Sequence, residues 1–191
     1  GKYQLSPEYF EIFDDENHDN KELIFAVDQR ADLNGHNRMA YFSLSGDMFP
    51  LPQFVNANGT DGPGITPDFY QSWVQAYGAD DPATMDPRFF KKNLVIPADS
   101  CIAAANFEIN RGILRGQQYG TRADKTRLVN FTEQIDYTPV GSGYSTGYRV
   151  EKYEFSKKSD TGRNRGEADI VIVRLADIYM MRAEANMRKG S

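Results

Sequence analysis

The fold of this chain is decided by the stretch Glu167-Ala-Asp-Ile-Val-Ile-Val-Arg-Leu-Ala-Asp-Ile-Tyr-Met-Met-Arg-Ala-Glu-Ala-Asn-Met-Arg-Lys-Gly190. Its residues return with the 3.6-residue period of a helix along two adjoining lines. The first line holds Leu175, Ile178, Tyr179, Arg182 and Ala183, and the second holds Ala176, Met180, Ala183 and Met187. No Gly or Pro interrupts the pattern before Gly190, which stands where a helix C-cap is expected. We predict one long helix over residues 169–188.

The apolar face of this predicted helix is broad. Small side chains at Ala176, Ala183 and Ala185 allow other helices to approach closely on more than one side. On the polar face, Glu184 and Arg188 are spaced to form an ion pair worth about 0.3 kcal/mol. Few other helical segments exist in the chain to cover the apolar face. We therefore expect the chain to expose apolar surface.

Composition narrows the class of protein. With 191 residues, 40% hydrophobic and 13% aromatic, the chain can form a packed core, as one large domain or a piece of a larger one. The net charge of −5 argues against nucleic acid as a partner, because phosphate binding needs clustered Lys and Arg. The single Cys101 excludes an internal disulfide, and no run approaches the roughly 20 apolar residues that span a bilayer. Because the chain opens on Gly1-Lys2 and stops after Gly190, we interpret residues 1–191 as a single fragment of a longer protein.

Short helices and strands joined by long loops are predicted for the rest of the chain. Ser6 and Thr66 each precede a Pro and occupy the N-cap position of predicted helices at 6–13 and 66–77. The predicted strands are a buried one at 22–27, others at 94–96, 128–137 and 144–155, and a weak helix or strand at 101–109. In the strand at 144–155, the alternating face is Tyr148, Val150, Tyr153 and Phe155. Residues 111–120 are interpreted as Gly-rich turns. The expected fold class is α+β, irregular, with few helices, short antiparallel strands and long loops.

The connection over residues 28–66 contains the first candidate binding residues. Its sequence predicts no clear helix or strand. Long irregular connections of this kind are usually functional or disordered, and the aromatic residues in this one argue against disorder. Sugar rings have C–H faces that stack on aromatic rings, and hydroxyls that need polar side chains. This connection places Asn37 and Arg38 close to Tyr41 and Phe42. We take these four residues as candidates for ligand binding.

Trp73, the only tryptophan, is the fifth candidate. An indole offers a large, flat surface on which a sugar ring can stack. Its helical spacing from Tyr70 and Tyr77 favours packing in the core, and ligand stacking stays open as the alternative.

Each acidic cluster has a structural explanation besides a chemical one. Asp80, Asp81 and Asp86 are of the type used in pairs for glycoside hydrolysis, but Asp-Pro steps also begin turns in which the Asp side chain bonds nearby backbone amides. The acidic run at 14–19 offers oxygen ligands for calcium, but it lacks the spacing of an EF-hand. We favour the turn and a solvated loop, and we predict no catalytic residue, no metal site and no cofactor.

Taken in order, five segments resemble the SusD/RagB family. Residues 9–27 are similar to the helix, acidic Asn-rich loop and strand that open its C-terminal region. The other four matches are 66–73 to its "T-P-E-L" helix, 85–89 to its "D-P-R" turn, 147–153 to its "G-Y…K-Y" strand, and 171–185 to its signature "P-V-I-R-L-A-D-V-Y-L-M-Y-A-E-A". The chain departs from this signature at Ile170 or Val171, where Pro is usual, and at Arg182, where an aromatic residue is common.

The resemblance implies a surface-exposed outer-membrane lipoprotein of Bacteroidetes-type bacteria. Such a protein binds glycan oligosaccharides without catalysis and passes them to a TonB-dependent, SusC-like transporter in polysaccharide utilisation. The resemblance also implies a lipid anchor outside this chain, and it places the C-terminal helix in a tetratricopeptide-like superhelix whose next helix follows Ser191. Three alternatives stay open: a helical-repeat scaffold for protein contact without its own ligand, a peptide-binding protein, and a glycoside hydrolase.

Overall fold

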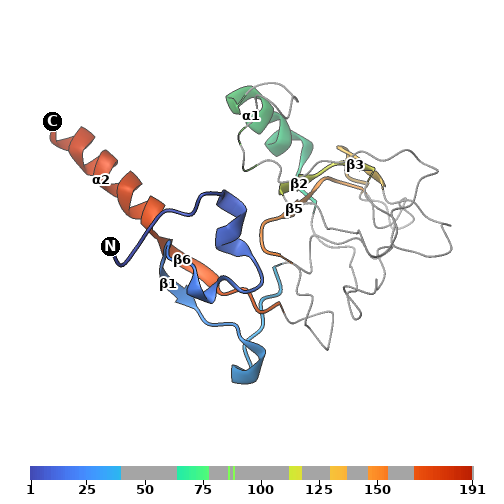
Figure 1. Cartoon of the computed structure of the whole chain (residues 1–191). Coiled ribbons are helices and arrows are strands. Elements are labelled where there is room, and N and C mark those ends of the chain that lie inside the picture. The colour runs from blue at the N-terminus through green and yellow to red at the C-terminus, as the bar shows by residue number, and fades with distance from the viewer. Residues whose placement is uncertain are drawn as a thin grey trace.

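The computed structural model of the chain describes residues 1–39, 64–77, 86, 88, 112–117, 130–136, 146–154 and 166–190. This part is α+β, as predicted, with three two-stranded antiparallel sheets (Figure 1). Its helices are the 3-10 helices η1 (Tyr9–Phe13), η2 (Asn17–Asp19) and η3 (Ala31–Leu33) and the α-helices α1 (Pro67–Tyr77) and α2 (Leu175–Lys189). Its strands are β1 (Leu23–Val27), β2 (Gly112–Leu114), β3 (Gly116–Gln117), β4 (Asn130–Phe131), β5 (Arg149–Glu151) and β6 (Ile170–Arg174). The sheets pair β1 with β6, β2 with β5, and β3 with β4.

The strand β1 confirms the position predicted at 22–27 but not the predicted burial. It runs antiparallel to β6, with Leu23 opposite Arg174 and Val27 opposite Ile170. The strand β1 contacts η2, but the Phe25 side chain points to solvent and is 58% exposed. The apolar run therefore reflects strand propensity more than burial.

The predicted long helix is shorter at its N-terminus. Residues 170–174 form β6, and α2 begins only at Leu175. The four β-branched residues Ile170, Val171, Ile172 and Val173 are stiff at χ1 and favour an extended backbone, which pairs with β1. The prediction of helix over 169–174 was therefore wrong.

A polar group of side chains fixes the junction between β6 and α2. The Asp177 carboxylate accepts a hydrogen bond of 3.0 Å from the Arg174 backbone N–H, which caps the helix N-terminus. The Arg174 guanidinium lies 3.4 Å from Asp177 and 3.6 Å from Glu22, which is almost fully buried. Glu22 Oε2 also accepts a hydrogen bond of 2.7 Å from the Ser6 N–H. Ser6 is thus not the predicted N-cap, and the helix that follows it is the 3-10 helix η1, whose own N-cap position is Glu8.

The far end of α2 agrees with the sequence. Gly190 has a φ of 74°, and its N–H donates to the carbonyl of Met187 at 3.1 Å, which confirms the predicted C-cap. The Arg188 guanidinium lies 2.6 Å from the Glu184 carboxylate, as expected.

Figure 1 shows α2 extending away from the rest of the described chain. None of its residues is buried, and Met187 is 74% exposed, so the expected apolar surface is present. The other exposed apolar side chains of α2 are Ile178, Tyr179, Met180 and Met181.

The acidic segment 14–20 is partly buried and is not the solvated loop that we favoured. Asn17 lies in the interior, where its Nδ2 donates to the carbonyls of Ile12 at 2.8 Å and Asp169 at 3.1 Å. Asp15 Oδ1 accepts a hydrogen bond from the Glu167 N–H at 3.1 Å. The segment therefore holds the strand entry at 166–169 in place.

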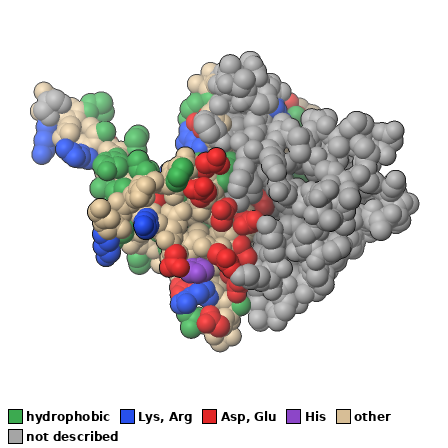
Figure 2. Space-filling view, in the orientation of Figure 1, with side chains coloured by type: hydrophobic (Ala, Val, Ile, Leu, Met, Phe, Trp, Pro, Cys, Tyr) green, Lys and Arg blue, Asp and Glu red, His purple; other side chains and the backbone are tan. Residues whose placement is uncertain are grey.

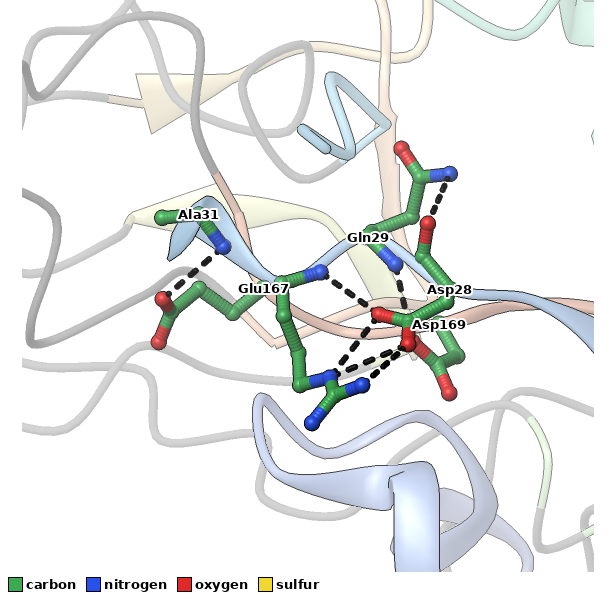
Figure 3. A network of polar contacts seen from close by, with 6 residues as sticks. Asp28, Gln29, Ala31, Glu167 and Asp169 are labelled. Atoms are coloured by element: carbon green, nitrogen blue, oxygen red, sulfur yellow. Dashed lines mark hydrogen bonds and ion pairs between the residues drawn. The ribbon is translucent and has the colours of Figure 1, made fainter. Parts of the chain in front are cut away.

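A second polar network lies beside this contact (Figure 3). The Gln29 N–H donates to Asp169 Oδ1 at 2.9 Å, and the Ala31 N–H donates to Glu167 Oε1 at 3.3 Å. An exposed ion pair of Asp28 with Arg30, 2.7 Å apart, borders the network. Side chains of 167–169 thus satisfy backbone groups at the point where the chain leaves β1.

The apolar face predicted for the strand at 144–155 is only partly buried, since Tyr153 is 5% exposed and Val150 is 44% exposed. Arg149 and Glu151 are 1% and 0% exposed, whereas Val150 points outward. The Arg149 guanidinium lies over the ring of Phe131, 5.5 Å from its centroid, so the buried cation rests on an aromatic face. The partner strand β2 lies within 111–120, so the interpretation of that segment as turns was wrong for 112–117. Of the predicted strand at 128–137, the structure describes residues 130–136, and within these the strand β4 is Asn130–Phe131.

Candidate functional site

A hollow of about 270 Å³ lies between η1, α1, β2 and β5. We call it the aromatic hollow, after the side chains on its walls. These are Tyr9 and Phe10 from η1, Phe69 and Trp73 from α1, together with Arg88 and Lys152. Ile113 and Val150 add aliphatic surface. The site thus combines flat rings with cationic groups.

Helix α1 positions the Trp73 side chain. It begins as predicted, with Pro67 as its first residue and Thr66 Oγ1 accepting a hydrogen bond of 3.3 Å from the Phe69 N–H. One face of the helix is anchored by Tyr70, which is buried against Ile113. On the neighbouring face, Phe69, Trp73 and Tyr77 follow each other at four-residue spacing, with centroid distances of 6.2 Å and 5.2 Å.

Contacts of Tyr70 with Arg115 and Tyr148 hold α1 in place. Its hydroxyl accepts a hydrogen bond of 2.7 Å from Arg115 Nη1, and its ring meets that of Tyr148 edge-to-face at 4.8 Å. Burial raises the pKa of Tyr70, although the charge of Arg115 acts in the opposite direction. Trp73 itself is half-buried. It packs against the cluster of Tyr70 and Ile113 and also lines the hollow, so the two interpretations left open by the sequence both apply.

The Asp86–Arg88 pair stands at the rim beside Trp73. Asp86 Oδ1 accepts a hydrogen bond of 2.9 Å from the Arg88 N–H, and both carboxylate oxygens receive the guanidinium. This confirms the turn interpretation for Asp86. The guanidinium carbon lies 5.7 Å from the Trp73 centroid and 5.6 Å from that of Tyr77. The hydrogen bonds from Arg88 hold the pKa of Asp86 below its ordinary value, and the same pairing raises the pKa of Arg88.

Residues of η1 and the segment after β5 form the opposite wall. The ring of Tyr9 lies 5.2 Å from that of Phe10 and 5.1 Å from that of Phe13. The Lys152 ammonium lies over the Phe13 ring at 4.4 Å from its centroid. Burial lowers the pKa of Lys152, and the positive charge of Arg174 lowers it further.

Of the five predicted site residues, three lie in the described part of the chain, and one of these, Trp73, lines the aromatic hollow. Asn37 is 2% exposed, since its Nδ2 donates to the Ala168 carbonyl at 2.9 Å and its Oδ1 accepts from the Met39 N–H at 2.9 Å. That side chain therefore serves the fold. Arg38 is exposed next to it and is not among the residues that line the hollow. The candidates Tyr41 and Phe42 lie outside the described residues.

A second, larger hollow of about 430 Å³ is acidic. It is lined by Glu11, Asp14, Asp15, Glu16, Asn17, Asn20 and Glu154. Acidic side chains also gather on the face of the described chain that Figure 2 shows. Among the described residues, no three His, Cys, Asp or Glu side chains are arranged to hold a metal ion. The Asp15 carboxylate instead accepts the hydrogen bond from the Glu167 N–H described above.

Sequence reasoning missed most of the walls of the hollow. Tyr9 and Phe10 were predicted only to lie in the short helix at 6–13, and Arg88 only to lie in the turn at 85–89. Lys152 drew no attention. The available signal was a set of aromatic residues on two predicted helices, but nothing in the sequence indicates that these helices meet.

Comparison with known proteins adds the family. No helix among the described residues combines the length and the apolar character that crossing a membrane requires. Searches of curated proteins and of solved structures found no match to the chain. The SusD family model, SusD_RagB, matches residues 21–191. Since this match covers most of the chain and contains β1, α1, β5 and the β6–α2 signature, the chain belongs to the SusD family.

Proposed function

We propose that the chain binds glycan oligosaccharides at the cell surface, without catalysis, and delivers them to a TonB-dependent outer-membrane transporter. Members of the SusD family are in general non-catalytic carbohydrate-binding proteins of nutrient uptake at the outer-membrane surface. The finer steps, ligand capture by this chain and transfer to a SusC-like partner, are our proposal.

The aromatic hollow is the observation that carries the proposal. Sugar rings have apolar C–H faces, and these suit the half-buried indole of Trp73 and the exposed ring of Phe69. Sugar hydroxyls need hydrogen-bonding partners, and Arg88 and Lys152 supply donors at the same hollow. The volume of about 270 Å³ lies near the lower end of small-molecule sites, which suits one ring of a longer chain.

The test is electrophoresis of the chain in native gels that contain soluble polysaccharides. We expect at least one polysaccharide to retard the wild-type chain. Trp73→Ala removes the stacking surface and abolishes the retardation, while the thermal unfolding curve shows that the variant still folds. Tyr179→Ala, which removes an exposed aromatic ring from α2, leaves the retardation unchanged and is the matched control. Tyr41→Ala, which is expected to behave like Trp73→Ala, tests the candidate in the 28–66 connection.

Other outcomes of this experiment favour the alternatives. If no polysaccharide retards the chain, the protein-contact scaffold is favoured, since α2 has the exposed apolar face that such a role needs. Release of reducing ends from any polysaccharide would contradict the non-catalytic role.

A further inference from the structure

Two exposed apolar side chains stand on different walls of the aromatic hollow. Phe69 on α1 is 48% exposed and Val150 on β5 is 44% exposed, and both line the hollow. Val150 lies directly opposite Ile113 across the β2–β5 pair, so these two aliphatic side chains share one face of the pair. Apolar surface in a concave site of this kind is typical of a place that a ligand covers.

The charged residues that line the same hollow have contacts within the chain. Arg88 Nε donates a hydrogen bond of 2.8 Å to Asp86 Oδ1. Glu151 is 0% exposed and so presents no carboxylate surface to a ligand. Lys152 is exposed, with its ammonium over the ring of Phe13. The described residues of the hollow therefore offer a ligand mainly rings and aliphatic groups.

A sugar ring that carries only hydroxyl groups uses part of this surface. Its C–H face covers the flat indole of Trp73, but hydroxyls placed against Phe69 and Val150 would lose water without gaining a hydrogen bond. An acetyl group suits the same place better. It presents a methyl group to the apolar side chains, and its carbonyl is a single acceptor for an N–H donor such as Arg88 or Lys152.

These observations deepen the proposed function and rest on it. We propose that the aromatic hollow selects a sugar ring that carries an acetyl group. The ring stacks on Trp73, the acetyl methyl group packs against Phe69 and Val150, and the acetyl carbonyl accepts a hydrogen bond from a cationic side chain of the hollow. The acetyl group has the same shape as an O-acetyl ester or as the N-acetyl amide of a hexosamine, and the experiment distinguishes these two sources.

The experiment compares matched ligands by isothermal titration calorimetry. For the ester, acetylated xylo-oligosaccharides and manno-oligosaccharides are each titrated beside the same preparation after alkaline deacetylation. For the amide, N-acetylchitotriose is titrated beside cellotriose, which has the same linkage and a hydroxyl in place of the acetamido group. We expect at least one acetylated ligand to bind about tenfold more tightly than its partner, as small apolar groups do in apolar pockets.

Variants of Val150 connect this preference to the hollow. Val150→Thr replaces one methyl group by a hydroxyl and is expected to lower the affinity ratio about fourfold, the factor that one buried methyl group gives. Val150→Ile keeps the apolar surface and retains the preference. The matched control is Val27→Thr on β1, since Val27 is 45% exposed and is not among the residues that line the hollow. This control leaves the tenfold ratio unchanged.

The outcomes separate the two proposals. Equal affinity for every acetylated ligand and its partner, or an equal loss of both with Val150→Thr, overturns the selection of acetylated sugars while leaving the glycan-binding function standing. If no member of the panel and no polysaccharide binds the wild-type chain, the proposed function fails and the inference falls with it. Urea unfolding of each variant shows that a changed ratio reflects binding and not misfolding.

Discussion

Asn17 and Asp169 are joined by two hydrogen bonds across 152 positions of sequence: the Asp169 N–H donates to Asn17 Oδ1 at 2.6 Å, and Asn17 Nδ2 donates to the Asp169 carbonyl at 3.1 Å. The side-chain amide of Asn17 thus pairs with a backbone as a neighbouring strand does. Both residues are buried, so neither bond can be replaced by water without opening the structure.

The first prediction concerns this pair. Asn17→Ala leaves the N–H and carbonyl of Asp169 and the carbonyl of Ile12 buried without the amide, so we expect the free energy of unfolding to fall by roughly 2–4 kcal/mol. Urea denaturation measures the change. The exposed neighbour His18 provides the control, because His18→Ala is expected to alter stability by less than about 0.5 kcal/mol. Equal effects of the two substitutions would show that the amide bonds do not hold the segment.

The second prediction compares two carboxylates on α2. Asp177→Ala removes the acceptor that caps the Arg174 N–H and also one partner of the Arg174 guanidinium, so we expect a loss of about 1 kcal/mol. Glu184→Ala removes only the exposed pair with Arg188 and costs about 0.3 kcal/mol. Denaturant midpoints at constant m-value give both numbers. The prediction is contradicted if Glu184→Ala is the more damaging change.

The third prediction uses Trp73 as a reporter of pH. Because Arg88 holds the pKa of Asp86 below the ordinary value of about 3.9, the pair stabilises the folded state above that pH, and the stabilisation is lost as pH falls through the lowered pKa. Protonation of Asp86 releases the guanidinium that lies over the indole. We expect the fluorescence of this single tryptophan to change below about pH 4, and the change to be absent in Asp86→Asn. An identical acid titration in that variant would assign the change to another group.

The fourth prediction concerns two glycines with positive φ. At Gly147, with φ of 80°, a Cβ would lie 2.9 Å from Ile135 Cγ1 and 3.2 Å from Gly64 Cα. At Gly116, with φ of 64°, a Cβ would meet nothing within 4 Å. Gly116→Ala should therefore cost only the conformational strain, about 1 kcal/mol, and Gly147→Ala distinctly more, roughly 2–3 kcal/mol. Thermal unfolding of the two variants side by side measures the difference that the contact makes.

The fifth prediction follows from the exposed face of α2. Met180 and Met187 lie among the apolar side chains that this helix exposes, and surfaces of this kind promote association. We expect sedimentation equilibrium to show an apparent mass that rises with concentration. Replacing both residues by Lys should lower the association, whereas Arg182→Lys, on the same helix, should not. A clean monomer at all concentrations contradicts the prediction.

Local signals in the sequence predicted the fold well where short-range chemistry decides it. Thr66 and Pro67 mark the start of α1, and Gly190 the end of α2, because caps act within one helical turn. The run of β-branched residues at 170–173 was assigned to a helix, since its pairing with β1 depends on a strand about 150 residues away.

The other differences between the predicted and the observed structure come from buried charged residues and from contacts between segments far apart in the sequence. The apolar pattern at 148–155 groups Val150 with Tyr153 on one face. The structure buries Tyr153 but exposes Val150 and buries its neighbours Arg149 and Glu151, an arrangement that hydrophobic periodicity cannot predict. At the candidate site, the chemistry of Trp73 was evident from the sequence. Its neighbours Tyr9 and Lys152 come from distant segments, so only the folded chain brings them together.

The pairing of β1 with β6 has a consequence for synthesis. Asp169 is translated 152 residues after Asn17, which at roughly 5–20 residues per second takes about 8–30 s. During that interval, β1 lacks its partner strand β6, and Phe13 of η1 lacks its ring contact with Tyr153. The N-terminal segment can therefore reach its final pairing only after residues 169–174 have been translated.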